Sequence, residues 1–244
     1  MERIGGKVSW RPEFAGECAV LRPRGVLDAE TYRSFGADLV RFAVDEPRAL
    51  IVVLDELEPA DDGAFTVFSA ARIRVLDWPG VPILLVAGAE PLRRRAAAAV
   101  RRVPVLESVA AALAAAPARP RGQRAGLAMP AGAASAQSAR EFVAGVCVRW
   151  NTAEFFTDAQ LLVTELVENA MLHAAGEVGV RLELRPGGLT VAVTDAAPQA
   201  AVLREPAAGE VQAYGLHVVA DLARSWGCVP RWPFGKVVWA TLPA

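Results

Sequence analysis

A carboxylate, an amide and an imidazole recur at intervals of four residues in the segment 161–174, which reads LLVTELVENAMLHA. The segment is rich in Leu, Ala, Glu and Met and contains no Gly or Pro, so its composition predicts a helix. The spacing would then place Glu165, Asn169 and His173 in one row along that helix. Such a row can orient a water, ligate a hard cation and hydrogen-bond a phosphate, although a solvated helix edge has the same residue types.

The neighbouring sequence supplies elements that could hold this polar row in place. Leu162, Leu166 and Ala170 form a second, apolar row that can face a hydrophobic core. The other elements predicted in this half are a strand at 123–130, a helix capped by Ser135 or Ser138 and ending at Trp150, a hairpin of 178–185 with 189–194, a helix at 214–226 and a last strand at 236–242. Helices combined with a mixed or antiparallel sheet predict an α+β sandwich.

This order of elements resembles the GHKL (Bergerat-fold) ATPase domain, and within it the bacterial anti-sigma factor serine kinases. The resemblance covers roughly residues 123–242 and implies a two-layer α+β sandwich that binds ATP and Mg²⁺. It implies that Glu165 is the general base for a serine hydroxyl and that Asn169 ligates Mg²⁺. His173, in the pattern N-A-x-x-H, would brace the same site.

The resemblance also implies where the rest of the nucleotide would lie. Asp195, the acid that ends the strand TVAVTD, would accept a hydrogen bond from the exocyclic amine of adenine. Gly215 and Leu216 would let the backbone approach the phosphates at a helix N-terminus. Thr241, on the last strand, would hydrogen-bond near the adenine.

Two glycines of the family pattern are replaced in this chain. The adenine motif Asp-x-Gly reads Asp195-Ala196-Ala197, and the phosphate motif Gly-x-Gly-Leu begins with Ala213. Each replacement puts a methyl group where the backbone would approach the ligand. The sequence therefore leaves two functions open: an ATP-binding serine kinase that phosphorylates an antagonist protein, or a nucleotide-poor pseudokinase that works as a protein-docking module.

The first half of the chain alternates strands with helices, which predicts an α/β domain. Its helices include one predicted at 105–116. The segments GVLDAETYRSF, LIVVLDELEPADDGAFTVF and WPGVPILLVAGAEP resemble a STAS domain, the fold of anti-sigma factor antagonists. In that family a serine in the loop after the central strand is phosphorylated, and the matching residue here is Asp62, which has no hydroxyl. The predicted consequence is loss of the phosphorylation switch.

These resemblances give a domain plan and a set of expected partners. We expect a STAS-like domain at 1–117, a linker at 118–122 within a stretch rich in Ala, Pro, Gly and Arg, and a kinase-like domain at 123–244. The expected partner is an anti-sigma antagonist or a sigma factor. The fusion also implies an intramolecular contact between the two halves, and the resemblance implies a homodimer.

Composition excludes several other classes of protein. The net charge of −1 offers no field to attract nucleic acid, and no apolar run approaches the length of a membrane span. The first ten residues contain no apolar core of a secretion signal, so we expect a cytoplasmic protein. Three scattered cysteines argue against a disulfide framework or a zinc site. Both histidines, His173 and His217, lie in the second half, so the first half offers no acceptor for a two-component histidine kinase.

Overall fold

The computed structural model describes residues 8–76, 78–118, 122–173, 176–197, 199–202, 215–231 and 234–244, with the side chain of His173 excepted. The chain divides into two compact units, Met1–Arg119 and Pro120–Ala244. This division falls within the stretch 118–122 that the sequence predicts as a linker. Ala213, from the predicted phosphate motif, lies outside the described residues.

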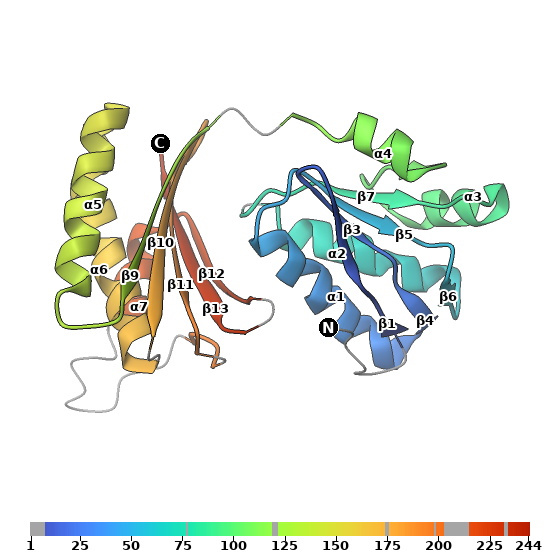
Figure 1. Ribbon diagram of the computed structural model, residues 1–244, viewed down its shortest axis with the longest axis horizontal. Coiled ribbons are helices and arrows are strands. Elements are labelled where there is room, and N and C mark those ends of the chain that lie inside the picture. The colour runs from blue at the N-terminus through green and yellow to red at the C-terminus, as the bar shows by residue number, and fades with distance from the viewer. Residues whose placement is uncertain are drawn as a thin grey trace. The chain divides into compact units, whose positions relative to one another are not determined.

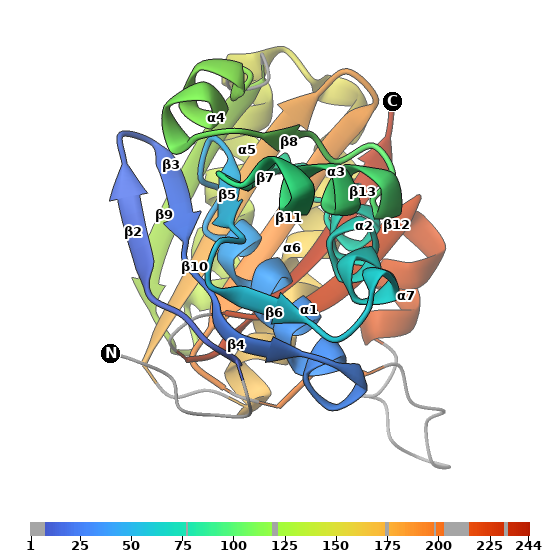
Figure 2. The same ribbon diagram turned by 90° about the vertical axis from the view of Figure 1, so that its right-hand side faces the viewer.

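The N-terminal unit is built on a five-stranded sheet in the order β2-β3-β5-β7-β8. The strands are β2 (Pro12–Ala15), β3 (Cys18–Leu21), β5 (Leu50–Val53), β7 (Ile83–Val86) and β8 (Val105–Leu106). All neighbours are parallel except β2 and β3, which form an antiparallel hairpin at one edge (Figure 2). The inner strands β5 and β7 are apolar and buried along their whole length, as expected for parallel strands covered on both faces.

Helices cover both faces of this sheet. Figure 1 shows α1 and α2 on the side opposite α4. The Asp28 side chain accepts hydrogen bonds from the backbone N–H groups of Glu30 and Thr31 and so caps α1. Phe35 of α1 and Phe68 of α2 meet edge to face, with ring centroids 5.9 Å apart. The helices are α1 (Ala29–Val44), η1 (Asp62–Phe65), α2 (Thr66–Arg74), α3 (Glu90–Ala99) and α4 (Val109–Ala115), and a small sheet joins β1 (Val8–Ser9), β4 (Arg24–Leu27) and β6 (Leu57–Pro59).

The C-terminal unit has a five-stranded antiparallel sheet in the order β12-β13-β11-β10-β9. The strands are β9 (Gln123–Pro130), β10 (Glu177–Arg185), β11 (Gly188–Asp195), β12 (Ser225–Pro230) and β13 (Lys236–Pro243). The turn between β10 and β11 uses Gly187 and Gly188 at φ values of +125° and +145°, where a side chain would be strained. The predicted hairpin and the predicted strand at 123–130 are therefore confirmed.

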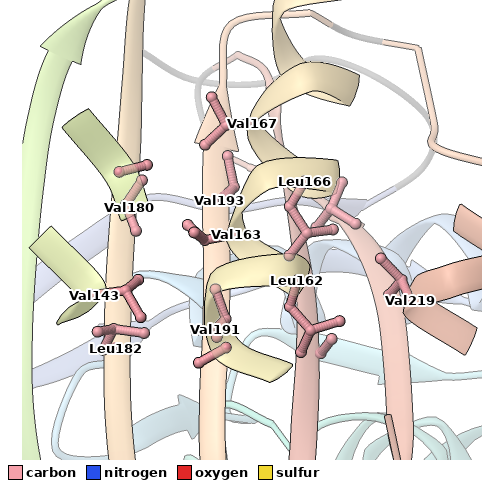
Figure 3. Packing of buried hydrophobic residues seen from close by; sticks show 14 of the residues in the cluster. Val143, Leu162, Val163, Leu166, Val167, Val180, Leu182, Val191, Val193 and Val219 are labelled. Atoms are coloured by element: carbon pink, nitrogen blue, oxygen red, sulfur yellow. The ribbon is translucent and has the colours of Figure 1, made fainter. Parts of the chain in front are cut away.

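Three helices pack on one face of this sheet (Figure 1). They are α5 (Ser135–Trp150), α6 (Phe156–His173) and α7 (Gly215–Leu222), with a short η2 (Ala153–Phe155) before α6. Figure 3 shows the core between the layers, where α6 places Leu162, Val163 and Leu166 against strand residues such as Val191 and Val193. The C-terminal unit is thus an α+β sandwich and the N-terminal unit is α/β.

Two predicted helices are partly wrong. Val105 and Leu106 form β8 beside β7, and Ser108 then caps the shorter helix α4 by accepting a hydrogen bond from the N–H of Ala111. The helix predicted at 214–226 ends as α7 at Leu222, and the following residues form β12. In both places apolar residues continue across the boundary between a helix and a strand, so the sequence does not mark that boundary. Pairing with a neighbouring strand decides where the strand lies. No helix in the described part of the chain is long and apolar enough to cross a membrane.

Candidate functional site

The polar row predicted on α6 lies beside its apolar stripe. Leu162, Leu166 and Ala170 are buried in the core, which confirms the predicted apolar row. Glu165 and Asn169 are each partly exposed, one turn apart at the margin of that stripe. The Oδ1 atom of Asn169 is buried and accepts no hydrogen bond from any described residue. A buried acceptor without a donor is uncommon in a folded protein and suggests that something else fills that role.

The first residue of α7 comes close to the carboxylate of Glu165. A Cβ atom built on Gly215 would lie 2.5 Å from Oε2 of Glu165, so only glycine fits without moving that carboxylate. Leu216 is buried in the core, and its side chain packs there. The structure therefore brings Glu165 and Gly215 together, and it leaves only the backbone of Leu216 for contact with a ligand.

Burial raises the pKa of Glu165 above the usual range of a glutamate, and the nearby carboxylate of Glu168 raises it further. Both effects disfavour the charged form of Glu165. A carboxylate with a raised pKa is a stronger base once it is ionised, which suits a group that takes a proton from a hydroxyl.

The same shift makes stability depend on pH. Because the pKa of Glu165 is higher in the folded chain than in the unfolded chain, the folded state loses stability as the pH rises from the unfolded pKa to the folded pKa. Glu165→Gln removes this loss. We expect the variant to have a larger free energy of unfolding than the wild type at neutral pH. The difference should disappear below the unfolded pKa of about 4.3. Urea unfolding of both proteins across this pH range measures it, and parallel pH profiles would contradict it.

Asp195 lies at the end of β11, and only one of its two carboxylate oxygens forms hydrogen bonds with described residues. Its Oδ1 accepts hydrogen bonds from Nζ of Lys236, at 2.9 Å, and from the N–H of Ala197, at 2.7 Å. The Lys236 Nζ also lies 2.9 Å from Oδ2, a close charge contact that lacks hydrogen-bond alignment. Both side chains are 1% exposed. The sequence predicts a role for Asp195 but none for Lys236, although a lysine that begins a strand of uncharged residues is a usable signal.

Thr241 is not brought to Asp195. Along β13, Val238, Ala240 and Leu242 face the helices, so Thr241 faces the other side of the sheet. Its hydroxyl lies 2.8 Å from the hydroxyl of Thr190 on β11. Thr241 is five residues along β13 from Lys236, the partner of Asp195, a distance of about 17 Å along the strand.

The described side chains near Asn169 offer few protein ligands for a cation. Among the described residues no group of three or more His, Cys, Asp or Glu side chains could hold a metal ion. Asn169 offers one buried amide oxygen without a donor. Mg²⁺ commonly takes one or two protein oxygens and completes its shell with water and phosphate. The residues therefore fit a Mg²⁺ that arrives with a phosphate ligand.

Asp62 lies in the N-terminal unit, at the start of η1. Its Oδ1 lies 2.9 Å from both Nε and Nη2 of Arg95, which projects from α3. The preceding Asp61 caps η1 by accepting a hydrogen bond from the N–H of Ala64. The two acids thus differ in role, because Asp61 stabilises the turn and Asp62 forms an exposed ion pair.

Comparison with known proteins gives limited similarity. No protein-family model and no curated protein matches the chain. The structure of an anti-sigma factor antagonist from Mycobacterium paratuberculosis matches with a TM-score of 0.38 and 18% sequence identity, over 45% of this chain and 93% of that one. The anti-sigma factor antagonist SpoIIAA in its unphosphorylated form matches with a TM-score of 0.33 and 16% identity, over 43% of this chain and 92% of that one. TM-scores below 0.5 carry no argument about fold or activity.

Proposed function

We propose that the C-terminal unit binds ATP with Mg²⁺ between α6, the start of α7 and the end of β11. It would transfer the terminal phosphoryl group to a serine of an antagonist-type protein, as in regulation by partner switching. The N-terminal unit would serve as the antagonist-like regulatory domain of the same chain. Because Asp62 has no hydroxyl, the phosphorylated serine would belong to another protein.

The observation that carries this proposal is the buried oxygen of Asn169, which has no hydrogen-bond partner among the described residues. Burying an acceptor without a donor costs about 1–3 kcal/mol, a cost that a ligand at this position would offset. Oδ1 of Asn169 lies on the same helix edge as Glu165, one turn away. The glycine at the start of α7 keeps the adjoining backbone close to that edge.

Each residue has a role in the proposed transfer. Glu165 would accept the proton of the serine hydroxyl, whose oxygen forms a bond to the terminal phosphorus while the bond to the leaving ADP oxygen breaks. The N–H groups at the start of α7, beginning at Gly215, would face the phosphates. Asn169 would ligate Mg²⁺, which supplies neutralisation of the phosphate charge when bound.

A docking module without turnover is the second candidate, and the surroundings of Asp195 favour it. Its carboxylate already has Lys236 as a counter-ion and Ala197 as a donor. The methyl group of Ala197 is buried where the family pattern has glycine. A fold that keeps Glu165 and Asn169 but binds no nucleotide would then act through protein contacts alone.

Calorimetric titration with ATP, with and without Mg²⁺, tests the proposal. We expect binding that requires Mg²⁺ and is weakened about 10–100-fold by Asn169→Ala, as for the loss of a group that holds a metal. Gln160→Ala is the matched control, because it removes a partly exposed amide from the same helix about 13 Å away. A wild type that binds no nucleotide would reject the kinase and leave the docking module. Equal binding by wild type and Asn169→Ala would reject the role of Asn169.

A further inference from the structure

Lys236 and Asp195 form an ion pair that is sealed inside the C-terminal unit. The Nζ atom lies 2.9 Å from each carboxylate oxygen, and each side chain is 1% exposed. The chain has only two lysines, and this one lies at the first position of β13, whose other residues are uncharged. An ammonium group so placed is held by a specific partner, since lysine is rarely buried without one.

The strands fix this pairing through their register. Asp195 and Lys236 are opposite one another at the ends of β11 and β13. By the alternation of β11 and β13, both point to the face that carries the helices. Gly235, at φ +88°, brings the start of β13 against the backbone of Asp195, where a Cβ atom would overlap the carbonyl oxygen. The ion pair is therefore built into the sheet and does not depend on a mobile side chain finding a partner.

The acceptor capacity of Asp195 is largely used by the protein itself. Oδ1 has two donors, the ammonium group of Lys236 and the N–H of Ala197. Oδ2 is buried and in close contact with the same ammonium group. Oδ2 forms no hydrogen bond with a described residue but lies against the ammonium group, so a ligand amine at this carboxylate would compete with Lys236 for it.

We propose that Lys236 is an internal competitor for the base of a bound nucleotide, so that the wild-type site binds purine nucleotides without reading the exocyclic amine through Asp195. The inference rests on the proposed nucleotide site and names its specificity. Affinity in the wild type comes from the phosphate side, near Asn169 and Gly215. Lys236 is a positioning residue, because it acts through Asp195.

Substitution of Lys236 by an uncharged side chain of similar length should leave the carboxylate of Asp195 free to accept a hydrogen bond from a ligand. In Lys236→Met the carboxyl group of Asp195 keeps the Ala197 donor and loses the ammonium group. An exocyclic amine would then supply the missing hydrogen bond. The variant should therefore discriminate between a base with the amine and the same base without it, because a site left with an unpaired buried acceptor rejects the ligand that cannot satisfy it.

The experiment compares ATP with purine riboside 5′-triphosphate, which lacks the exocyclic amine, by calorimetry in the presence of Mg²⁺. The full-length wild type should bind the two within about twofold of each other, and Lys236→Met should prefer ATP by about tenfold or more. Lys236→Gln, which keeps a polar end in place of the charge, is the second variant if Lys236→Met is poorly folded. The double variant Asp195→Ala/Lys236→Met should lose the preference.

A wild type that already prefers ATP about tenfold, or folded Lys236 variants that show no preference while binding both nucleotides, would overturn the inference and leave the nucleotide site intact. Failure of both nucleotides to bind to the wild type and to the folded variants would overturn the proposed function, and the inference with it. Binding by the variants alone would overturn the inference, which requires the wild type to bind both nucleotides, and would reject the proposed kinase activity of the wild type.

Discussion

Replacing Lys236 by methionine is expected to lower the free energy of unfolding by about 3–5 kcal/mol, because the change removes one partner of a buried ion pair. The remaining side chain of Asp195 is 1% exposed, so water cannot readily solvate its carboxylate. Lys236 contributes a buried hydrocarbon stem as well, and methionine fills a similar volume. The expected loss therefore comes mainly from the uncompensated charge. Urea unfolding at neutral pH measures it.

A double-mutant cycle separates the charge from the packing. Replacing both members, as Asp195→Leu/Lys236→Met, puts apolar groups of similar size where the pair was, a change that is often neutral or stabilising. The double variant should therefore be more stable than Lys236→Met alone, and the cycle should give a large coupling energy. If Lys236→Met lost less than about 1 kcal/mol, the pair would behave like an exposed salt bridge, and its burial would be in doubt.

Gly235→Ala should cost about 2–4 kcal/mol, the sum of backbone strain and overpacking. Gly235 has φ +88°, and its Cβ atom would overlap the carbonyl oxygen of Asp195, which is backbone and cannot swing aside. The start of β13 would have to move away from β11. The thermal unfolding midpoint measures the loss.

Gly132→Ala is the matched control for this substitution. Gly132 lies in an exposed turn between β9 and α5, and a Cβ atom there meets no atom within 4 Å. Its stability should change by no more than about 0.5 kcal/mol. Similar losses for Gly132→Ala and Gly235→Ala would show that alanine costs stability at both positions for a general reason, and would contradict the close contact with Asp195.

Much of the C-terminal fold could be predicted because its signals are local. The alternation of β10 and β11 around Pro186 and two glycines is a hairpin signal that needs no tertiary information. The sequence does not predict β12, because Ser225, Gly227 and Cys228 are not strong strand formers. The alternation of the strand becomes visible only in the structure, where Trp226 and Cys228 pack against the core. The strand exists because β13 offers it a partner, which is a tertiary effect.

Some residues of the candidate site could also be predicted from local sequence, and others could not. Glu165 and Asn169 lie in one row because they are four residues apart in a helix, a spacing that can be read from the sequence. Asp195 and Lys236 are 41 residues apart in the chain, and their pairing depends on the register of two strands, which no local pattern encodes. Thr241 illustrates the same limit, because a shift of one residue decides which face of the sheet a side chain occupies.

The ion pair between Asp62 and Arg95 changes how the N-terminal unit would look to an approaching protein. A carboxylate with a guanidinium group 2.9 Å away forms a short dipole, whose field falls off faster than that of a single charge. At physiological ionic strength the fields of exposed charges are screened over about 8 Å. The ion pair at position 62 would therefore produce almost no electrostatic potential beyond that distance. A phosphoserine carries close to two negative charges, and one arginine would leave part of that charge uncancelled. Asp62 would therefore be a poor imitation of a phosphorylated residue, and a partner that senses long-range charge would read this turn as unmodified.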